Sequence, residues 1–291
     1  MNGTIVSLNV GQPRLVTYRG MSFRTGIFKD PIDKPQLLKK LNFTGDGQAD
    51  LSAHGGIDKA VYCYPIEHYA FWQNQTGRAV LPMGQFGENV TTEGILESQL
   101  RIGDVLRMGS AIVQVSEPRI PCYKLVMRME AGSDFAARFL SANRTGFYCR
   151  VLAEGVVGRS DAVTRLSSDP SSPSVSEVFA ATQFADRDPL ALRRVVKARD
   201  ISVKWQSRVR RMIDTEVHRR IAAPRSQQSS FAVERIESET ANVRSIWLRP
   251  VDGAPLSGWL PRDSISPSSG PTASVAPIAC RRSKPTGTAS L

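Results

Sequence analysis

The sequence predicts a mainly β protein with α-helices: a β-barrel over residues 1–166, then a small three-helix bundle over residues 174–222. Short alternating or apolar runs, broken repeatedly by glycine turns, are typical of barrel strands. A Ser/Pro-rich linker at residues 167–173 separates this region from sequence with helical spacing and helix-capping patterns. The remaining C-terminal segment carries no complete core of its own, so we expect it to be disordered.

Individual elements of the barrel region follow from local patterning. Residues 4–10 alternate between polar and apolar side chains except at Val6, and the apolar runs that follow are bounded by Gly103-Asp104 and Gly109-Ser110. The aromatic side chains of residues 66–75 gather on one helical face, which indicates core packing. We expect strands over residues 4–10, 100–106, 111–115 and 146–152, and helices over 66–75 and 134–140.

Three helices are predicted after the linker. Ser174 and Glu177 form a capping-box pattern, and Asp188-Pro189 offers an N-cap followed by an N1 proline. The third helix is indicated by apolar residues at helical spacing, Ile201, Trp205, Val209 and Met212. We expect Trp205 to be a core residue.

The last 61 residues fall into two unlike pieces. Residues 231–261 alternate as strands do and end near a Pro-Val-Asp-Gly turn signal. Residues 262–291 are dominated by Ser, Pro, Thr, Ala and Gly, with almost nothing to bury, and are predicted to be disordered.

Composition indicates a cytoplasmic protein that does not enter a membrane. The chain has 291 residues, 41% of them hydrophobic, and no apolar run approaches the roughly 20 residues that cross a bilayer. No cationic segment followed by an apolar stretch opens the chain. The four cysteines, Cys63, Cys122, Cys149 and Cys280, show no CxxC pair, which suits a reducing compartment.

The net charge of +11 raises the question of nucleic-acid binding. Residues 185–225 hold twelve Lys or Arg against five Asp or Glu, so seven of the eleven net charges lie in one helical segment. Such faces are usually solvated surface, and no basic–aromatic interleaving or RNA-binding motif accompanies them. We therefore do not expect nucleic acid as a partner, although a basic-helix binding module remains a competing hypothesis.

The loop at residues 117–125 (Glu-Pro-Arg-Ile-Pro-Cys-Tyr-Lys-Leu) is the strongest local signal for chemistry. Pro118 and Pro121 stiffen the backbone that presents Cys122. Arg119 and Lys124 place positive charge near the sulfur, which favours the thiolate that binds soft metals or attacks electrophiles. The alternative is an inert, buried cysteine in a strand-to-helix turn. Cys63 and Cys149, by contrast, alternate with apolar neighbours as core residues do.

Three further motifs precede this loop: residues 45–51 (Gly-Asp-Gly-Gln-Ala-Asp-Leu), 54–62 (His-Gly-Gly-Ile-Asp-Lys-Ala-Val-Tyr) and 86–91 (Phe-Gly-Glu-Asn-Val-Thr). Glycine pairs let backbone N–H groups approach an anion, cations neutralise it, and Cys122 offers a soft ligand. Their combination and order resemble the MOSC domain family, and in particular the bacterial MOSC proteins that detoxify N-hydroxylated bases such as 6-hydroxylaminopurine. The resemblance covers residues 1 to about 215.

This resemblance implies a β-barrel that binds the molybdenum cofactor, molybdopterin, with Cys122 as the molybdenum ligand. It implies an oxidoreductase that reduces small N-hydroxylated compounds to amines, with the oxygen released as water. A thiolate suits this role because it donates charge to the metal. The competing hypothesis is a sulfur carrier or cofactor-transfer protein in which Cys122 acts as a persulfide or ligand.

Site residues are expected from the same motifs. Lys59, Asn89 and Arg119 would lie near the pterin and phosphate as charge partners or hydrogen-bonding groups, with Gly55 and Gly56 also in the cofactor loop. His54 is the candidate for catalytic proton delivery, because its ordinary pKa lies near neutrality; the alternative is a hydrogen bond to a loop carbonyl. We expect His68 and His218 to be structural or exposed, and Glu88 to orient a ligand or cap a turn.

Residues 231–261 resemble the first strands of a ferredoxin-reductase-type flavin-binding barrel, to which some MOSC proteins are fused. No flavin motif, nicotinamide domain or cysteine cluster follows. We expect a truncated fusion whose residues 231–261 are poorly ordered or packed on the helical bundle. FAD, iron–sulfur clusters and pyridoxal phosphate are accordingly not expected in this chain. Electrons would come from a separate flavin or iron–sulfur reductase.

Overall fold

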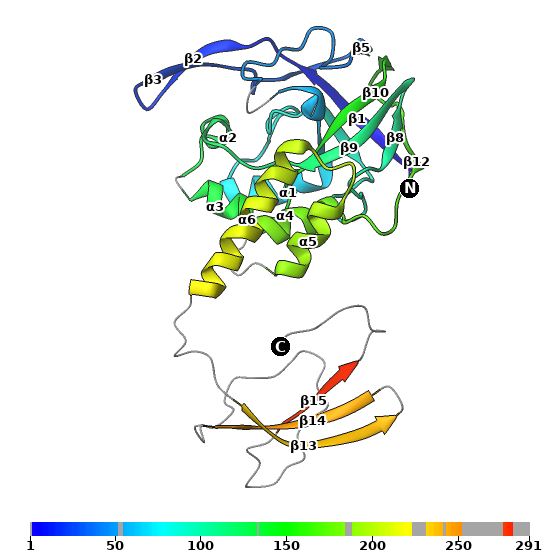
Figure 1. The fold of residues 1–291 in the computed structure, drawn as a ribbon. Coiled ribbons are helices and arrows are strands. Elements are labelled where there is room, and N and C mark those ends of the chain that lie inside the picture. Colours follow the sequence, from blue (N-terminus) through cyan, green and yellow to red (C-terminus); the bar gives the residue numbers. More distant parts are fainter. Residues whose placement is uncertain are drawn as a thin grey trace. The chain divides into compact units, whose positions relative to one another are not determined.

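The computed structural model describes residues 2–51, 55–132, 134–183, 188–222, 231–240, 243–251 and 276–281. The chain divides into two compact units, residues 1–217 and residues 218–291 (Figure 1). The first unit contains β1 (Asn2–Val10), β2 (Arg14–Tyr18), β3 (Met21–Thr25), β4 (Asp30–Ile32), β5 (Gln36–Leu38), β6 (Val61–Pro65), β7 (Val90–Glu93), β8 (Val105–Met108), β9 (Ala111–Pro118), β10 (Phe147–Ala153), β11 (Gly155–Val157) and β12 (Ala162–Ser167). Its helices are η1 (Ile57–Lys59), η2 (Ile66–His68), α1 (Tyr69–Thr76), α2 (Tyr123–Met129), α3 (Phe135–Ala142), α4 (Val175–Gln183), α5 (Pro189–Lys197) and α6 (Val203–Ala222).

A closed, mixed β-barrel forms the centre of the first unit, as predicted. Within the described residues seven strands follow one another in the order β12-β8-β9-β10-β6-β7-β1, with β4 added beside β1. The barrel closes because β1 pairs antiparallel with β12, where Gly3 lies opposite Val163. The sheet is mixed because β6 and β7 run parallel, with Cys63 opposite Val90. Outside the barrel, β2 pairs with β3 and β5 pairs with β11.

The predicted strands and helices of the barrel region are found with one clear difference. The run at residues 100–106 is a strand only from Val105 onward. Asp104 is fully buried and accepts a hydrogen bond from Arg101 N at 3.0 Å, while its own N–H donates to Arg101 O at 3.0 Å. This side-chain cap favours a turn over residues 101–104 in place of the extended strand.

Two hydrophobic clusters stabilise the unit. One fills the barrel and includes Cys63 and Cys149, both fully buried as predicted. The other lies between β6 and helices α1, α2 and α3 and is rich in aromatic rings, among them Trp72, which stacks on Phe139 with centroids 5.3 Å apart. The aromatic side of the predicted helix at residues 66–75 is therefore core.

All three helices predicted after the linker are present, and their caps form as the sequence indicates. Ser174 N donates to Glu177 Oε2 at 2.7 Å and Glu177 N donates to Ser174 Oγ at 3.1 Å, which makes a capping box. Asp188 caps α5 through Leu190 N. Buried apolar side chains from all three helices, among them Trp205, belong to the same cluster as the barrel core. A separate three-helix bundle therefore stays a prediction.

The second unit contains a three-stranded antiparallel sheet in its described residues: β13 (Phe231–Thr240), β14 (Val243–Pro250) and β15 (Ala276–Arg281). β13 and β14 fall where strand-like sequence is predicted, and over these residues the structure differs from the expectation of poor order. β15 lies within the tail predicted to be disordered, and over these six residues the structure differs from that prediction. They hold the tail's apolar stretch, Pro-Ile-Ala-Cys, which pairs with β14. The rest of residues 262–291 lies outside the described residues, and the resemblance to a reductase barrel stays a prediction.

Among the described residues, no helix combines the length and the apolar character needed to cross a bilayer.

Candidate functional site

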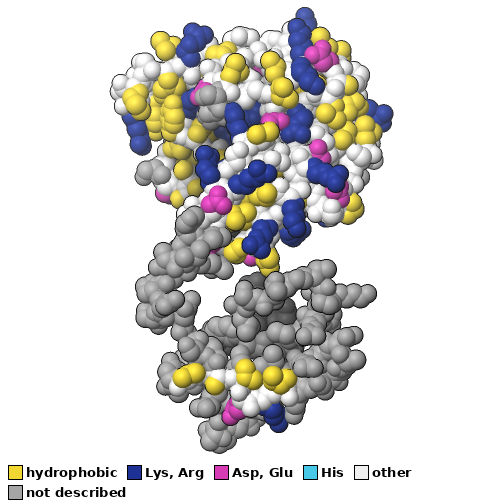
Figure 2. Space-filling model, in the orientation of Figure 1, with side chains coloured by type: hydrophobic (Ala, Val, Ile, Leu, Met, Phe, Trp, Pro, Cys, Tyr) yellow, Lys and Arg dark blue, Asp and Glu magenta, His cyan; other side chains and the backbone are white. Residues whose placement is uncertain are grey.

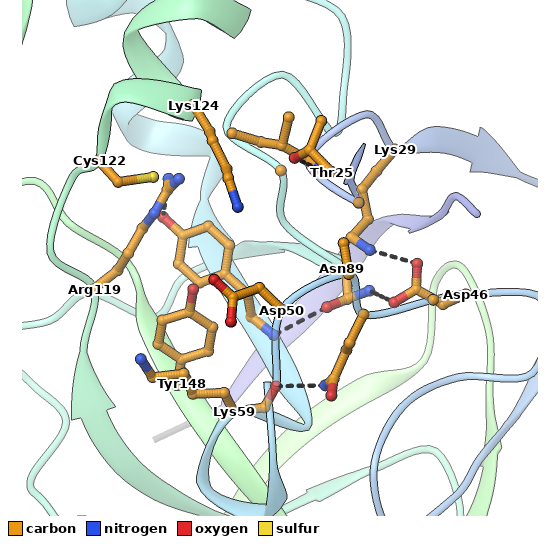
Figure 3. Close-up of a pocket in the computed structure, with 17 residues that line it drawn as sticks. Thr25, Lys29, Asp46, Asp50, Lys59, Asn89, Arg119, Cys122, Lys124 and Tyr148 are labelled. Carbon is orange, nitrogen blue, oxygen red and sulfur yellow. Dashed lines mark hydrogen bonds and ion pairs between the residues drawn. The ribbon is translucent and has the colours of Figure 1, made fainter. Parts of the chain in front are cut away.

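A cleft in the first unit gathers side chains from segments that are distant in sequence (Figure 3). Its empty volume is about 610 Å³, which includes space open to solvent. Four basic side chains and two carboxylates line it, so its formal charge is positive. The lining residues are Thr25, Gly26, Ile27, Lys29, Asp46, Gly47, Gln48, Ala49, Asp50, Lys59, Tyr62, Gly87, Asn89, Arg119, Cys122, Lys124 and Tyr148.

Cys122 lies in the turn between β9 and α2. Its backbone is extended (φ −128°, ψ 170°), and its carbonyl oxygen accepts the first hydrogen bonds of the helix, from Leu125 N at 2.9 Å and Val126 N at 3.3 Å. Cys122 is therefore the N-cap residue of α2. Its side chain is half-buried and lines the cleft. The strand end and the helix start together fix the position from which the thiol is presented.

Arg119 is buried beside Cys122. Its Nη1 donates to Phe86 O at 2.8 Å and to the Tyr62 hydroxyl at 3.3 Å, and its guanidinium carbon lies 4.9 Å from the centre of the Tyr62 ring. Burial lowers the pKa of this guanidinium, but Tyr62, Tyr148 and Cys122 together raise it above its ordinary value. Arg119 thus places a permanent positive charge next to the thiol.

Two lysines add to the positive charge of the cleft. Lys124, in the first turn of α2, is largely buried, and its Nζ lies 5.9 Å from the centres of the Phe23 and Tyr123 rings. Lys59 ends η1; its Nζ is 3.2 Å from Glu117 Oε1 and 5.5 Å from the Tyr148 ring centre. Burial raises the pKa of the Glu117 carboxyl, and Lys59 opposes that shift.

The opposite side of the cleft is a closed polar network of Lys29, Asp46 and Asn89, which we call the acid-paired side (Figure 3). Lys29 Nζ and Asp46 Oδ1 form a buried ion pair, and Gly11 N donates to the same oxygen at 2.9 Å. Asn89 Nδ2 donates to Asp46 Oδ2 at 2.9 Å, and Asn89 Oδ1 accepts from Tyr62 N at 3.2 Å. The Asn89 amide therefore joins β6, β7 and the loop at Asp46.

Glu88 organises the turn that brings Gly87 and Asn89 to the cleft. The carboxylate is fully buried and accepts hydrogen bonds from Gly84 N at 2.9 Å, from Phe86 N at 3.0 Å and from the Tyr69 hydroxyl. Burial raises the pKa of the Glu88 carboxyl, while the bonds from Tyr69, Gly84 and Thr91 oppose the shift. Of the two roles considered for Glu88, the structure therefore shows the turn-capping one.

A family model described as the MOSC domain matches residues 50–164. YflK from Bacillus subtilis is 39% identical over 204 residues, which cover 70% of this chain and 91% of YflK. This chain belongs to the MOSC domain family.

Two further comparisons place this MOSC protein among its relatives. The crystal structure of YiiM from Geobacillus stearothermophilus aligns with a TM-score of 0.62 and 29% identity, over 72% of this chain and 99% of that one. A protein named Reductase from Gibberella moniliformis is 28% identical over 209 residues, which are 71% of this chain and 34% of its own length. The MOSC protein therefore shares its barrel and helices with YiiM, and the family is associated with the molybdenum cofactor.

Four residues predicted for the site, Lys59, Asn89, Arg119 and Cys122, line the same cleft of the MOSC protein. Gly55 and Gly56 do not line it. Gly56 has a positive φ of 94° and its N–H donates to Gln48 Oε1 at 3.1 Å, so this loop is tied to the wall of the cleft. The cofactor role of the two glycines stays a prediction.

The histidines fall into different classes. His54, predicted for proton delivery, lies outside the described residues. His68 is buried; its Nε2 lies 2.8 Å from Glu97 Oε2 and its Nδ1 lies 2.9 Å from an Arg144 nitrogen. Because Arg144 can only donate, Nδ1 accepts and Nε2–H donates to Glu97. The expected structural role of His68 is confirmed, and the side chain of His218 lies outside the described residues.

Two parts of the cleft were not predicted from the sequence: the segment at residues 25–29, and Tyr148. Lys29 has no local motif, since its partner Asp46 lies 17 residues away and meets it only in the folded barrel. Tyr148 belongs to a predicted strand, and its polar ring among apolar neighbours was the available signal. Only the folded structure shows why Gly26 is a glycine: a Cβ at this position would lie 2.5 Å from Gly47 O.

Proposed function

We propose that this MOSC protein is a molybdenum-cofactor-dependent oxidoreductase that reduces N-hydroxylated bases or related N-hydroxylated compounds to amines. The reaction consumes two electrons and two protons, breaks the N–O bond and releases the oxygen as water. The observation that carries the proposal is a single cysteine, Cys122, in a cleft lined by Lys29, Lys59, Arg119 and Lys124. Oxidoreductase activity in general is supported by the family and by the relative named Reductase.

The chemistry of the cleft fits an anionic cofactor that brings most of its own metal ligands. Within the described residues no group of three or more His, Cys, Asp or Glu side chains is arranged to hold a metal ion. One thiolate among cations suits a metal whose remaining ligands belong to a negatively charged organic group. Of the two carboxylates, Asp46 is already paired with Lys29, which reduces its repulsion of an anion.

Cys122 would hold the metal through its thiolate. When bound, the cofactor would supply the two-electron chemistry that removes the hydroxyl oxygen. The positive charge of Arg119 favours the thiolate over the thiol, because it stabilises the charged form. Arg119 is itself held by Phe86 O and Tyr62, so this charge is fixed in place before any ligand arrives.

Binding and proton supply fall to the other basic residues. Lys124 reaches into the cleft from α2, and Lys59 reaches it from η1 (Figure 3). Both ammonium groups can donate hydrogen bonds to phosphate or pterin oxygens. Each also carries a proton at Nζ that could be delivered to a leaving hydroxyl, as could His54. Electrons would come from a separate flavin or iron–sulfur reductase.

The first test is the molybdenum-to-protein ratio, with pterin detection, for the full chain made in a molybdopterin-producing host. We expect a ratio near one for the wild type and a collapse for Cys122→Ser. Cys63→Ser is the matched control, because Cys63 lies in the barrel core and should leave the ratio unchanged. Little metal and pterin in correctly folded wild-type protein would refute the proposal.

Turnover is the second test. Loaded wild-type protein should reduce 6-hydroxylaminopurine with a chemical reductant such as dithionite. A protein that binds the cofactor but shows no turnover would favour the competing function, transfer of sulfur or cofactor through Cys122. Mass spectrometry of Cys122 for an added sulfur atom then decides that alternative.

A further inference from the structure

The β2–β3 hairpin projects away from the barrel (Figure 1). Its turn residues Arg19 and Gly20 both have positive φ, 50° and 77°, as a two-residue turn of type I′ requires. The pairing is regular over five residues of each strand, from Arg14–Thr25 to Tyr18–Met21. A two-stranded hairpin is marginal by itself, so contacts with the rest of the unit must hold it.

The hairpin has one packed face and one open face. On the packed face, Phe23 meets Tyr123 edge to face, with centroids 5.1 Å apart. On the open face, Leu15, Thr17, Ser22 and Arg24 are all exposed, and Leu15 has 67% of its surface accessible. Met21 near the tip is 61% exposed. Leu15 and Met21 lie on opposite faces of the hairpin, so they form no extended apolar patch, and any apolar contact with a partner is small.

Charge on the hairpin has one sign. Arg14, Arg19 and Arg24 are exposed, and residues 11–29 contain no Asp or Glu. Two of the arginines are held in place: the Arg14 guanidinium lies 3.6 Å from the Phe28 ring centre, and Arg24 Nη2 donates to Pro13 O at 2.8 Å. A preorganised cationic surface loses little side-chain entropy when it binds an acidic one.

The hairpin is joined directly to the cleft. The chain leaves β3 through Thr25, Gly26 and Ile27, which line the cleft, and the ring that packs on Phe23 belongs to the residue after Cys122. Lys124 Nζ also lies 5.9 Å from the Phe23 ring. A protein seated on the hairpin would therefore sit at the rim of the cleft, next to the Cys122 turn.

We propose that the β2–β3 hairpin is the docking surface for an acidic electron-transfer protein, which delivers electrons to the cleft. This inference rests on the proposed function, because only a reductase needs such a donor. The partner is identified by complementarity: carboxylates for Arg24 on the open face, Arg19 at the tip and Arg14 on the face of Phe23, and a small apolar contact for Leu15 beside Arg24. Electron-transfer complexes bury little area and rely on electrostatic steering, which suits a small cationic hairpin.

Binding tests the surface without any need for turnover. The probes are two acidic carriers, a plant-type ferredoxin and a flavodoxin, titrated against the full-length protein at low salt and at 0.3 M salt. We expect the wild type to bind at least one carrier with an affinity that falls with salt, and Arg14→Glu/Arg19→Glu/Arg24→Glu to weaken it at least tenfold. If charge reversal prevents folding, Arg14→Gln/Arg19→Gln/Arg24→Gln replaces it in the same titration, and we expect this variant to lose less carrier affinity.

A matched control is available because Lys and Arg side chains are spread over the face drawn in Figure 2. Arg193→Glu/Lys197→Glu/Arg199→Glu reverses three exposed cations on and just after α5, and should leave carrier affinity within twofold of the wild type. Equal weakening by the two triple variants, or binding of neither carrier to the wild type, would overturn the docking site. So would self-association of the wild type that the hairpin variant abolishes, because the hairpin would then bind a second copy.

Turnover separates this inference from the proposed function. With dithionite, the hairpin variant should match the wild type, whereas with the reduced carrier it should be at least tenfold slower. Equal rates with the carrier would refute the docking site and leave the reductase intact. No turnover of loaded wild type with either reductant would refute the proposed function, whatever the binding data show.

Discussion

On one side of the cleft Lys29 is paired with Asp46, whereas on the other side Arg119 faces hydroxyl and carbonyl oxygens. In the described part of the chain neither Arg119 nor Lys124 forms an ion pair with a carboxylate. We call Arg119, Cys122 and Lys124 the Cys122 side. Similar side chains thus serve two purposes: the acid-paired side neutralises its cation within the protein, and the Cys122 side keeps positive charge available to a ligand.

We therefore expect the acid-paired side to contribute mainly to the stability of the fold and the Cys122 side to contribute mainly to ligand binding. A buried ion pair whose remaining polar atoms are also bonded is part of the fold, and breaking it leaves a charge without compensation. Cations without a carboxylate partner are less stabilised in the empty protein and gain most when an anion arrives. Substitutions on the two sides should therefore affect different measurements.

The largest effect should come from Asp46→Ala. It leaves the Lys29 ammonium buried without a counter-charge and removes the acceptor of Asn89 Nδ2, so we expect the free energy of unfolding to fall by about 3–5 kcal/mol. Urea denaturation of the full chain measures this. Asp46→Asn/Lys29→Met removes both charges and should recover most of the loss. A cost below about 1 kcal/mol for Asp46→Ala would mean that the network is not structural.

Next in size is Cys122→Ser on the Cys122 side. We expect turnover with dithionite to fall at least about 100-fold, because a hydroxyl is a poor substitute for a thiolate ligand. The melting temperature of the unloaded protein should change little, since Cys122 is only half-buried. Cys63→Ser, in the barrel core, should lower the melting temperature and leave turnover by the folded protein nearly unchanged. If Cys122→Ser and Cys63→Ser lowered the melting temperature equally, Cys122 would be a structural core residue like Cys63.

A smaller effect is expected for Arg119→Lys, which keeps the charge but not the forked geometry. Both hydrogen bonds, to Phe86 O and to Tyr62, come from Nη1, and the shorter lysine side chain places its ammonium closer to the backbone than this nitrogen. We expect about a tenfold loss of cofactor affinity, measured as molybdenum retained on dialysis. The exposed Arg107→Lys is the control. Full retention by Arg119→Lys would show that charge alone suffices on this side.

The smallest effect concerns Glu117 and pH. Burial raises the pKa of this carboxyl above its usual value of 4.5, so the folded chain holds a proton that the unfolded chain releases. Its contribution to stability is therefore greatest below pH 4.5 and is lost as the pH rises through the raised pKa. Glu117→Gln does not titrate, so the difference in unfolding free energy between wild type and variant should change across that window. A constant difference from pH 4 to pH 8 would contradict the shift.

The motifs of the cleft were readable from sequence, but their partners were not. Residues 45–51, 54–62, 86–91 and 117–125 each contribute lining residues because glycines, prolines and isolated cations mark them locally. Lys29 and Tyr148 carry no such mark; they reach the cleft through the pairing of β4 with β1 and of β10 with β6. Barrel pairing is a long-range property that local patterning does not encode.

Of the two errors along the chain, one is local and the other is long-range. The strand at Val105 starts late because one buried side chain, Asp104, competes for the backbone of the preceding turn. The tail strand β15 needs a partner in β14, which composition does not reveal. Capping patterns at Ser174 and Asp188, in contrast, act within a few residues, and both were predicted correctly.

The closure of the barrel also sets the order in which the protein can be completed during synthesis. β1 can pair early with β4, through residues 8–10, and later with β7 on its other edge. The rest of the edge that β4 occupies waits for β12, where Asn2 meets Thr164. At roughly 5–20 residues per second, a ribosome needs about 8 to 32 seconds to make those 160 or so residues. The nascent chain therefore carries an unpaired strand edge for that interval, when it is open to association with other chains.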